Sequence, residues 1–166
     1  MLRNRAEILL EVDYYPPRAE SLEALLLALE AHRVERVYLK GDRFFCWSFD
    51  STLGDENAYP EELLSAFYDR AEAHGMRILP AVSASFLTFA LSRRFGAEEP
   101  LSGPGIAYCR ELFEDLLSFF YRNERELLLL ESPPRSPQTA WAIEAASNLG
   151  IRTETSSWTE FPCWNP

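Results

Sequence analysis

The chain has 166 residues, of which 47% are hydrophobic and 25% are charged, and its formal net charge is −10. This length and composition are typical of one globular domain, whereas a complete (β/α)8 barrel usually needs about 250 residues. The negative charge disfavours nucleic acid and anionic membrane surfaces as partners, because both are themselves negatively charged.

The first half of the chain contains two strand–helix units. A strand is expected at residues 7–15, before a pair of prolines. Leu22, Leu25, Leu26 and Leu29 then have the i, i+3, i+4, i+7 spacing of a helix with one buried stripe. A second strand is expected at residues 34–45. The second helix begins at Pro60, has acidic residues in its first turn, and ends at Gly75.

The second half repeats this pattern after a third strand at residues 76–83. Residues 84–105 are expected to be irregular, with a short helix at most at 86–94, because they contain the breakers Gly96, Pro100, Gly103 and Pro104. The remaining elements are a long helix at 106–122, a strand at 126–131, a helix at 138–149 and a strand at 151–157. Strands that alternate with helices predict a parallel sheet wrapped by helices.

Cysteine and histidine do not form a cluster. The residues concerned are Cys46, Cys109, Cys163, His32 and His74. An odd number of cysteines at long spacing, without a CxxC motif, argues against a disulfide framework and a zinc site. We therefore expect no metal and no cofactor.

The N-terminus carries Glu7 and Glu11 too early to contain the apolar core of a signal peptide. No run approaches about 18 consecutive apolar residues, so no membrane-spanning helix is expected. Together these features predict a cytoplasmic protein.

The carboxyl ends of the predicted strands carry the candidate functional residues, because ligands bind at this edge in parallel α/β folds. The set comprises Asp13, Asp42, Trp47, Ser83, Glu131, Trp158 and Glu160. Carboxylates bind sugar hydroxyls, and the C–H faces of a pyranose stack on aromatic rings, so the combination indicates carbohydrate. Glycoside hydrolysis typically uses two carboxyl groups. Glu131 follows four leucines directly, which favours a general acid with a raised pKa.

Structural explanations compete with each of these assignments. A single carboxylate at a strand end is more often a helix N-cap or a solvated group, and Asp13 could organise a turn. The aromatic residues around Trp47 and Trp158 could belong to the core or cover an open sheet edge. The cysteines have no neighbouring histidine, and the serines near Ser83 lack a G-x-S-x-G turn, so nucleophilic catalysis is disfavoured.

The order of these features resembles the catalytic barrel of family 20 glycoside hydrolases, the β-N-acetylhexosaminidases, over residues 6–162. Leu10-Glu11-Val12 is similar to the first-strand Leu-Asp-Val of that family, and Asp42-x-Phe44 to its second-strand Glu-Asp-Thr-Phe. The stretch from Tyr59 to Leu63 resembles the start of its third unit. Trp158-x-Glu160 resembles its Trp-x-Asp on strand five.

The fourth strand departs from the family pattern His-x-Gly-x-Asp-Glu. Glu131 matches the glutamate, which is the general acid, but Leu130 replaces the aspartate that orients the acetamido group of the substrate. The histidine and glycine are absent, and the first-strand arginine that binds the sugar has no clean match, since Arg5 lies one position off. A leucine can neither orient the acetamido oxygen nor balance its developing charge.

The resemblance implies a partial TIM-type (β/α) barrel, with about five parallel strands and four main helices, in one domain over residues 1–166. It implies a hexosaminidase-like glycoside hydrolase of reduced or no activity, acting on an amino-sugar glycoside. Glu131 would be the catalytic acid, and the substrate would be bound by Asp13, Asp42, Trp47, Trp158 and Glu160. The alternative is a non-catalytic carbohydrate-binding or interaction domain, a half-barrel that a homodimer could complete.

Overall fold

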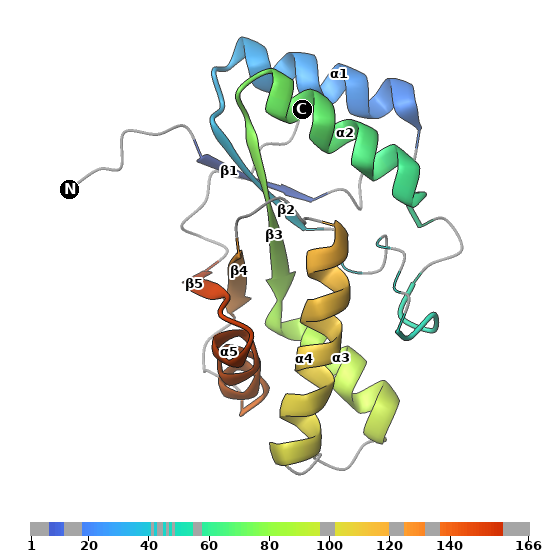
Figure 1. The fold of residues 1–166 in the computed structure, drawn as a ribbon, viewed down its shortest axis with the longest axis vertical. Coiled ribbons are helices and arrows are strands. Elements are labelled where there is room, and N and C mark those ends of the chain that lie inside the picture. The colour runs from blue at the N-terminus through green and yellow to red at the C-terminus, as the bar shows by residue number, and fades with distance from the viewer. Residues whose placement is uncertain are drawn as a thin grey trace, which may run out of the picture.

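The computed structural model describes residues 7–11, 18–40, 42, 45, 47, 49–54, 58–96, 102–119, 125–131 and 137–157. The elements in chain order are β1 (Glu7–Glu11), α1 (Ala19–Ala31), β2 (Arg36–Lys40), α2 (Glu61–Ala73), β3 (Arg77–Ser83), α3 (Ala84–Phe95), α4 (Ser102–Phe119), β4 (Glu126–Glu131), α5 (Pro137–Asn148) and β5 (Arg152–Ser157). The five strands form one parallel sheet in the order β1-β2-β3-β4-β5. The predicted α/β architecture is confirmed (Figure 1).

The segment after β3 differs from the prediction, because most of it is helical. Ser83 starts α3 as its N-cap, and its side-chain oxygen accepts a hydrogen bond from the Phe86 N–H at 3.1 Å. Pro104 lies in the first turn of α4, where the missing N–H costs nothing. The described part of the chain therefore contains the four expected main helices, α1, α2, α4 and α5, and in addition α3, which is longer than the short helix allowed at 86–94.

The second strand is shorter than predicted and ends at Lys40. Asp42 has a φ of +33°, which is incompatible with an extended strand. The chain therefore turns as soon as β2 has reached the edge of the sheet.

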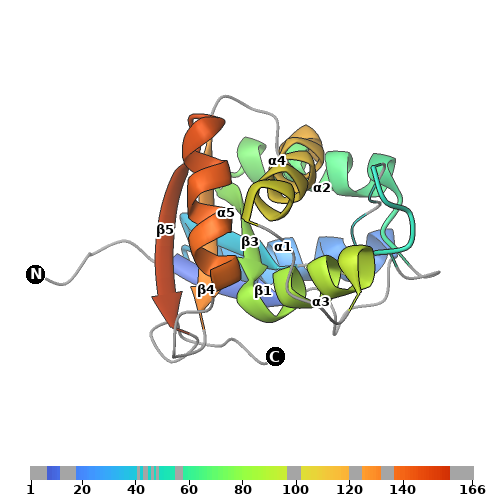
Figure 2. The same cartoon turned by 90° about the horizontal axis from the view of Figure 1, so that it is seen from below.

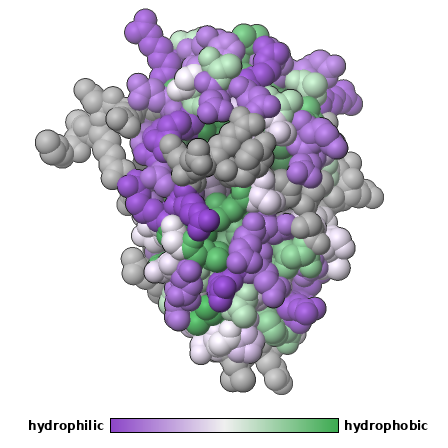
Figure 3. All heavy atoms as spheres, in the orientation of Figure 1, coloured by the Kyte–Doolittle hydropathy of each residue, from purple (hydrophilic) through white to green (hydrophobic). Residues whose placement is uncertain are grey.

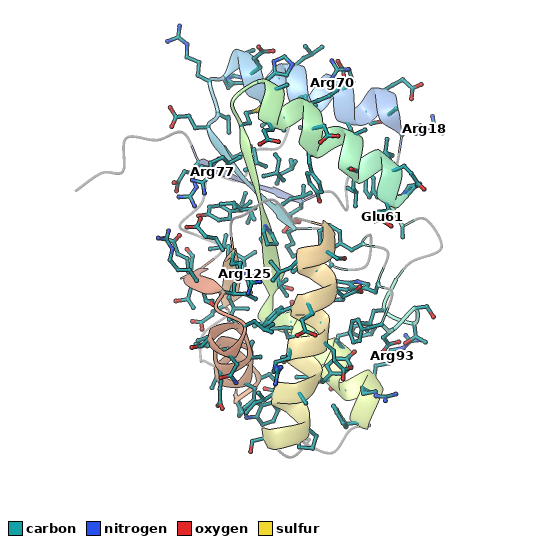
Figure 4. All side chains as sticks on the ribbon, viewed as in Figure 1. Arg18, Glu61, Arg70, Arg77, Arg93 and Arg125 are labelled. Carbon is teal, nitrogen blue, oxygen red and sulfur yellow. The ribbon has the colours of Figure 1, made fainter. Side chains whose placement is uncertain are left out.

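The helices bury their apolar stripes against one face of the sheet. The main core cluster contains the leucine stripe of α1 together with Leu10, Val37, Leu39, Leu127 and Leu129 from the strands. Figure 1 shows α1 and α2 side by side at one end, and α3, α4 and α5 grouped at the other. Arg70 of α2, labelled in Figure 4, also forms an exposed ion pair with Glu23 of α1 at 2.6 Å.

The opposite face of the sheet has its own small core, made only of strand residues. These residues are Leu9, Tyr38, Leu79, Ala81, Leu128 and Leu130, and each is at most 2% exposed. They alternate along the strands with the helix-facing residues, as the two faces of a pleated sheet require. This face corresponds to the interior of a barrel.

Long side chains reach across this interior and show that the sheet is strongly curved. Arg36 of β2 pairs with Glu126 of β4 at 2.7 Å, and the Tyr38 hydroxyl of β2 donates to Glu154 of β5 at 3.2 Å. In a flat sheet, β2 and β5 would lie about 14 Å apart. Figure 2 shows the strands curving beside the helices when the molecule is viewed from below.

The amino-terminal ends of the strands close the interior with ion pairs. Arg36 also binds Glu7 of β1 at 3.1 Å, and Glu126 also binds Arg152 of β5 at 2.6 Å and Arg77 of β3 at 3.5 Å. These ion pairs link β2 to β1 and β4, and they link β3 and β5 to β4. The interior is therefore charged at its amino-terminal end and apolar in the middle.

The face of the molecule seen in Figure 3 is largely polar where its residues are described. Figure 3 shows hydrophilic residues over much of the face seen in Figure 1, with hydrophobic residues in separate patches. The exposed large hydrophobic residues of the described chain are Leu27, Phe89 and Phe95. No described helix combines the length and the apolar character that a membrane span requires.

Candidate functional site at the carboxyl ends of the strands

The carboxyl-terminal end of the interior is polar, above the apolar layer. Glu11 ends β1, Lys40 ends β2 and Ser83 ends β3, while Asp42 follows two residues after Lys40. By strand alternation the first three lie on the same face as Leu9, Tyr38 and Ala81, which is the interior. We call Glu11, Lys40, Asp42 and Ser83 the carboxyl-end polar cluster.

Lys40 lies between two carboxylates in this cluster. Its Nζ atom is 2.8 Å from Oδ2 of Asp42 and 3.8 Å from Oε1 of Glu11. Lys40 is 6% exposed, and Asp42 is 9% exposed. Burying an ammonium group costs free energy unless it is paired, and these two carboxylates provide partners for the Lys40 side chain.

Ser83 extends the cluster to β3 and the start of α3. Its hydroxyl donates to Oδ2 of Asp42 at 3.2 Å, and its oxygen lies 3.0 Å from the hydroxyl oxygen of Ser85. Ser83 is buried, whereas Ser85 is exposed. A chain of polar contacts thus runs from the surface at the first turn of α3 to the buried carboxylate of Asp42.

Trp47 holds Asp42 from the other side. Its indole N–H donates to the backbone oxygen of Asp42 at 2.8 Å. The ring stacks on Phe86, with centroids 5.7 Å apart, and meets Phe45 and Phe49 edge to face. Trp47 is 4% exposed, so its geometry favours packing behind Asp42 over stacking on a sugar.

The loop after β2 is anchored further along by Asp50 and Tyr108. Tyr108 of α4 donates its hydroxyl to Asp50 Oδ2 at 3.3 Å, and Thr52 donates to Oδ1 through its N–H and its hydroxyl. Burial raises the pKa of Asp50, but the hydrogen bonds from Thr52 and Tyr108 outweigh it and lower that pKa below its usual value. Burial, together with Asp50, raises the pKa of Tyr108.

Glu131 lies at the same edge of the sheet, at the end of β4. Its neighbour Leu130 pairs with Ser83 in the strand register, which places Glu131 one residue beyond the serine that contacts Asp42. Leu130 is fully buried in the interior, while Glu131 is half-buried and follows the alternation of the helix-facing residues. Glu131 therefore lies at the carboxyl edge of the sheet, on the helix-facing side of β4.

The described residues include only part of the predicted site. Asp42 follows the end of β2 and Glu131 ends β4, so both lie at one edge of the sheet with β3 between their strands. Asp13, Trp158 and Glu160 lie outside the described residues, so their roles stay predictions. Within the described ranges, no group of three or more His, Cys, Asp and Glu side chains could hold a metal ion.

The sequence reasoning missed Lys40, although a signal for it was present. Lys40 ends the buried strand Arg36–Lys40, in which every residue is buried. It is also the single lysine among the 16 basic residues of the chain, all the others being arginines. A charged residue on the interior side of a buried strand, at the ligand-binding edge, is a candidate by position alone.

Comparisons with known proteins support the fold. No protein-family model matches the sequence, and no curated protein matches it. A family 20 β-N-acetylglucosaminidase superposes with a TM-score of 0.63 and 11% identity, over 92% of this chain and 43% of its own. A β-hexosaminidase of Streptomyces plicatus superposes with a TM-score of 0.64 and 12% identity, over 95% of this chain and 39% of its own.

A different sugar-active enzyme is also similar. The maltogenic α-amylase AmyB of Thermotoga neapolitana gives a TM-score of 0.59 and 15% identity, over 94% of this chain and 46% of its own. The chain thus spans less than half the length of these three proteins. At such low identity the likeness concerns the fold, which is that of part of the (β/α) barrel of family 20 β-N-acetylhexosaminidases.

Proposed function

We propose that the chain is a glycoside-hydrolase-like domain that binds an amino-sugar glycoside at the carboxyl ends of its strands. The observation that carries this proposal is the carboxyl-end polar cluster, which lies above a sealed apolar layer in a barrel of glycosidase type. Carboxylate oxygens accept, and an ammonium group donates, the hydrogen bonds that sugar hydroxyls form.

Within this proposal Glu131 acts as the general acid. It ends β4 at the carboxyl edge of the sheet, directly after the buried residues Leu127 to Leu130, and a carboxyl group is one of the side chains that serve as general acids. Asp42 binds the sugar, and Trp47 supports Asp42 through the hydrogen bond to its backbone oxygen. Asp13, Trp158 and Glu160 would complete the rim.

The test is turnover of an aryl N-acetylglucosaminide by the wild type and by Glu131→Gln. The matched control is Glu144→Gln, because Glu144 is exposed on α5, the helix that follows β4. We expect Glu131→Gln to abolish hydrolysis while circular dichroism shows an unchanged fold, and the control to leave the rate intact. Equal turnover in wild type and Glu131→Gln would remove Glu131 from the mechanism.

A non-catalytic carbohydrate-binding domain is the second candidate, and Leu130 favours it. Leu130 is fully buried in the interior core and stands where the family pattern has an aspartate. It supplies no hydrogen bond to an acetamido group. Binding of N-acetylglucosamine or chito-oligosaccharides without turnover, measured by calorimetric titration, would favour this candidate, and the absence of both would reject both functions.

A homodimer could complete the barrel. Among the described strands, β1 and β5 each pair on one side only, and such edges offer free ladder positions to a partner. Sedimentation equilibrium distinguishes the states, and a monomer at all concentrations would reject this assembly.

A further inference from the structure

Lys40 is a basic residue of unusual type and place. Fifteen of the 16 basic residues are arginines, and the three that line the amino-terminal end of the interior, Arg36, Arg77 and Arg152, are among them. The single lysine lies at the opposite, carboxyl-terminal end. Its ammonium group is a compact point charge with three hydrogen-bond donors on a flexible stem.

The two carboxylates around Lys40 are not equivalent. Asp42 Oδ2 lies at 2.8 Å, a charge-assisted hydrogen bond, while Glu11 Oε1 lies at 3.8 Å, beyond hydrogen-bond range. The Lys40 and Asp42 side chains are 8% and 11% exposed, and that of Glu11 is 21% exposed. Solvent screens the pair with Asp42 least, so Lys40 acts mainly on Asp42.

Asp42 is also held in a strained backbone conformation. Its φ of +33° lies in a region that non-glycine residues occupy only when their surroundings impose it. Among the described residues, the contacts that hold Asp42 include Lys40 on β2, Ser83 on β3 and the Trp47 indole in the following loop. Such over-determined, strained residues cluster at binding and catalytic sites.

We propose that Lys40 is the positioning residue of the carboxyl-end site, which keeps Asp42 ionised and aims its carboxylate at the ligand. The role in ligand binding rests on the proposed function, whereas the coupling of Lys40 to Asp42 does not. A purely structural ion pair would add stability, but its removal would leave the affinity of a correctly folded protein for sugar unchanged.

The first measurement uses the wild-type protein alone. Selective 15N-labelling of lysine gives one side-chain Nζ resonance, because the chain has a single lysine. We expect this resonance to shift with the same pH midpoint as the carboxyl carbon of Asp42 in a 13C-detected titration. A Lys40 resonance that does not respond when Asp42 titrates would overturn the coupling, and no variant is needed to see it.

The second measurement compares Lys40→Met, Lys40→Arg and the control Glu11→Gln. Loss of the ammonium should raise the midpoint of the Asp42 titration by about one pH unit or more. In Lys40→Arg, which keeps a positive charge, the midpoint should return most of the way to the wild-type value. Glu11→Gln, which alters the more distant neighbour, should have the smaller effect. An unchanged midpoint in folded Lys40→Met would refute the proposal.

The third measurement is the affinity of the same variants for N-acetylglucosamine and chito-oligosaccharides. We expect Lys40→Met to bind at least about tenfold more weakly, in line with a lost charge-assisted contact to the ligand-binding carboxylate, and Lys40→Arg to recover most of the affinity. Unchanged affinity together with a raised midpoint would reduce Lys40 to a structural role. If the wild type binds no sugar, the proposed function fails, while the two titrations still decide the coupling.

Discussion

Replacement of Gly105 by alanine tests the contact between α4 and α5. Gly105 is buried in α4, and a Cβ atom built on it would lie 2.8 Å from Cε3 and 3.1 Å from Cζ3 of Trp141 on α5. These atoms belong to a rigid ring, so the ring or the helix must move. Gly103 lies two residues earlier in the same helix, and its Cβ would meet nothing within 4 Å.

The two glycines should therefore respond with opposite sign. Alanine in place of glycine stabilises a helix by about 1 kcal/mol. Gly103→Ala should therefore raise the free energy of unfolding by up to that amount. At Gly105 an overpacking cost of about 2 kcal/mol outweighs the same gain, so Gly105→Ala should lower the free energy of unfolding by about 1 kcal/mol. In a domain of this size 1 kcal/mol corresponds to roughly 2–4 °C in Tm, so the variants should differ by about 4–8 °C.

Thermal unfolding followed by circular dichroism measures this difference. In a Trp141→Leu background the ring is absent, and Gly105→Ala should lose most of its penalty, with a coupling energy of about 1–2 kcal/mol. If Gly105→Ala is as stable as Gly103→Ala in the wild-type background, Gly105 does not pack closely against Trp141 and the reasoning is refuted.

Three further predictions concern a turn, a tyrosine and a cysteine. Arg33 has a φ of +55° in the turn where the Val34 N–H donates to the Leu29 oxygen. Because glycine adopts this conformation without strain, Arg33→Gly should raise the free energy of unfolding in guanidinium by about 0.5–1 kcal/mol. A lower free energy of unfolding in the variant would contradict backbone strain at Arg33. Burial, opposed by Arg36 and aided by Glu154, raises the pKa of Tyr38 to about 12 from 10.0. The folded state thus holds the phenol proton more tightly than the unfolded state. The free energy of unfolding should therefore be highest below about pH 10 and fall as the pH rises towards 12, and it should fall less in Tyr38→Phe. Equal pH profiles of the wild type and Tyr38→Phe would exclude a stabilising role of the Tyr38 proton. Burial raises the pKa of Cys109 to about 12, so in a variant with its other two cysteines replaced by serine a disulfide reagent should label Cys109 only after unfolding.

The local elements could be predicted because they depend on residues close together in the chain. The leucine spacing of 22–29 produced α1, and the apolar run after Glu126 produced β4, both in the expected places. The errors arose where two local rules compete. Gly103 and Pro104 were read as helix breakers, but in a first turn proline is tolerated, and α4 begins at Ser102.

The candidate site could be predicted only in part. The strand ends predicted that Asp42 and Glu131 lie at one edge of the sheet, because parallel strands bring their carboxyl ends together, whereas the roles of the two residues stay predictions. The same logic did not show what surrounds Asp42: Trp47 donates a hydrogen bond to its backbone oxygen, and Lys40 pairs with its carboxylate. Neither relation is visible in a linear pattern, since the first depends on the turn after β2 and the second on which side of β2 faces the interior.

The sequence by itself determined the alternation of strands and helices, the apolar faces, and the edge at which polar residues gather, because each follows from periodicity along a few turns of chain. Only the tertiary structure decided that Arg36 reaches Glu126 and that Ser83 meets Asp42. Those contacts join residues on different strands. They depend on the register and curvature of the whole sheet, which set the distances between strands that no local pattern encodes.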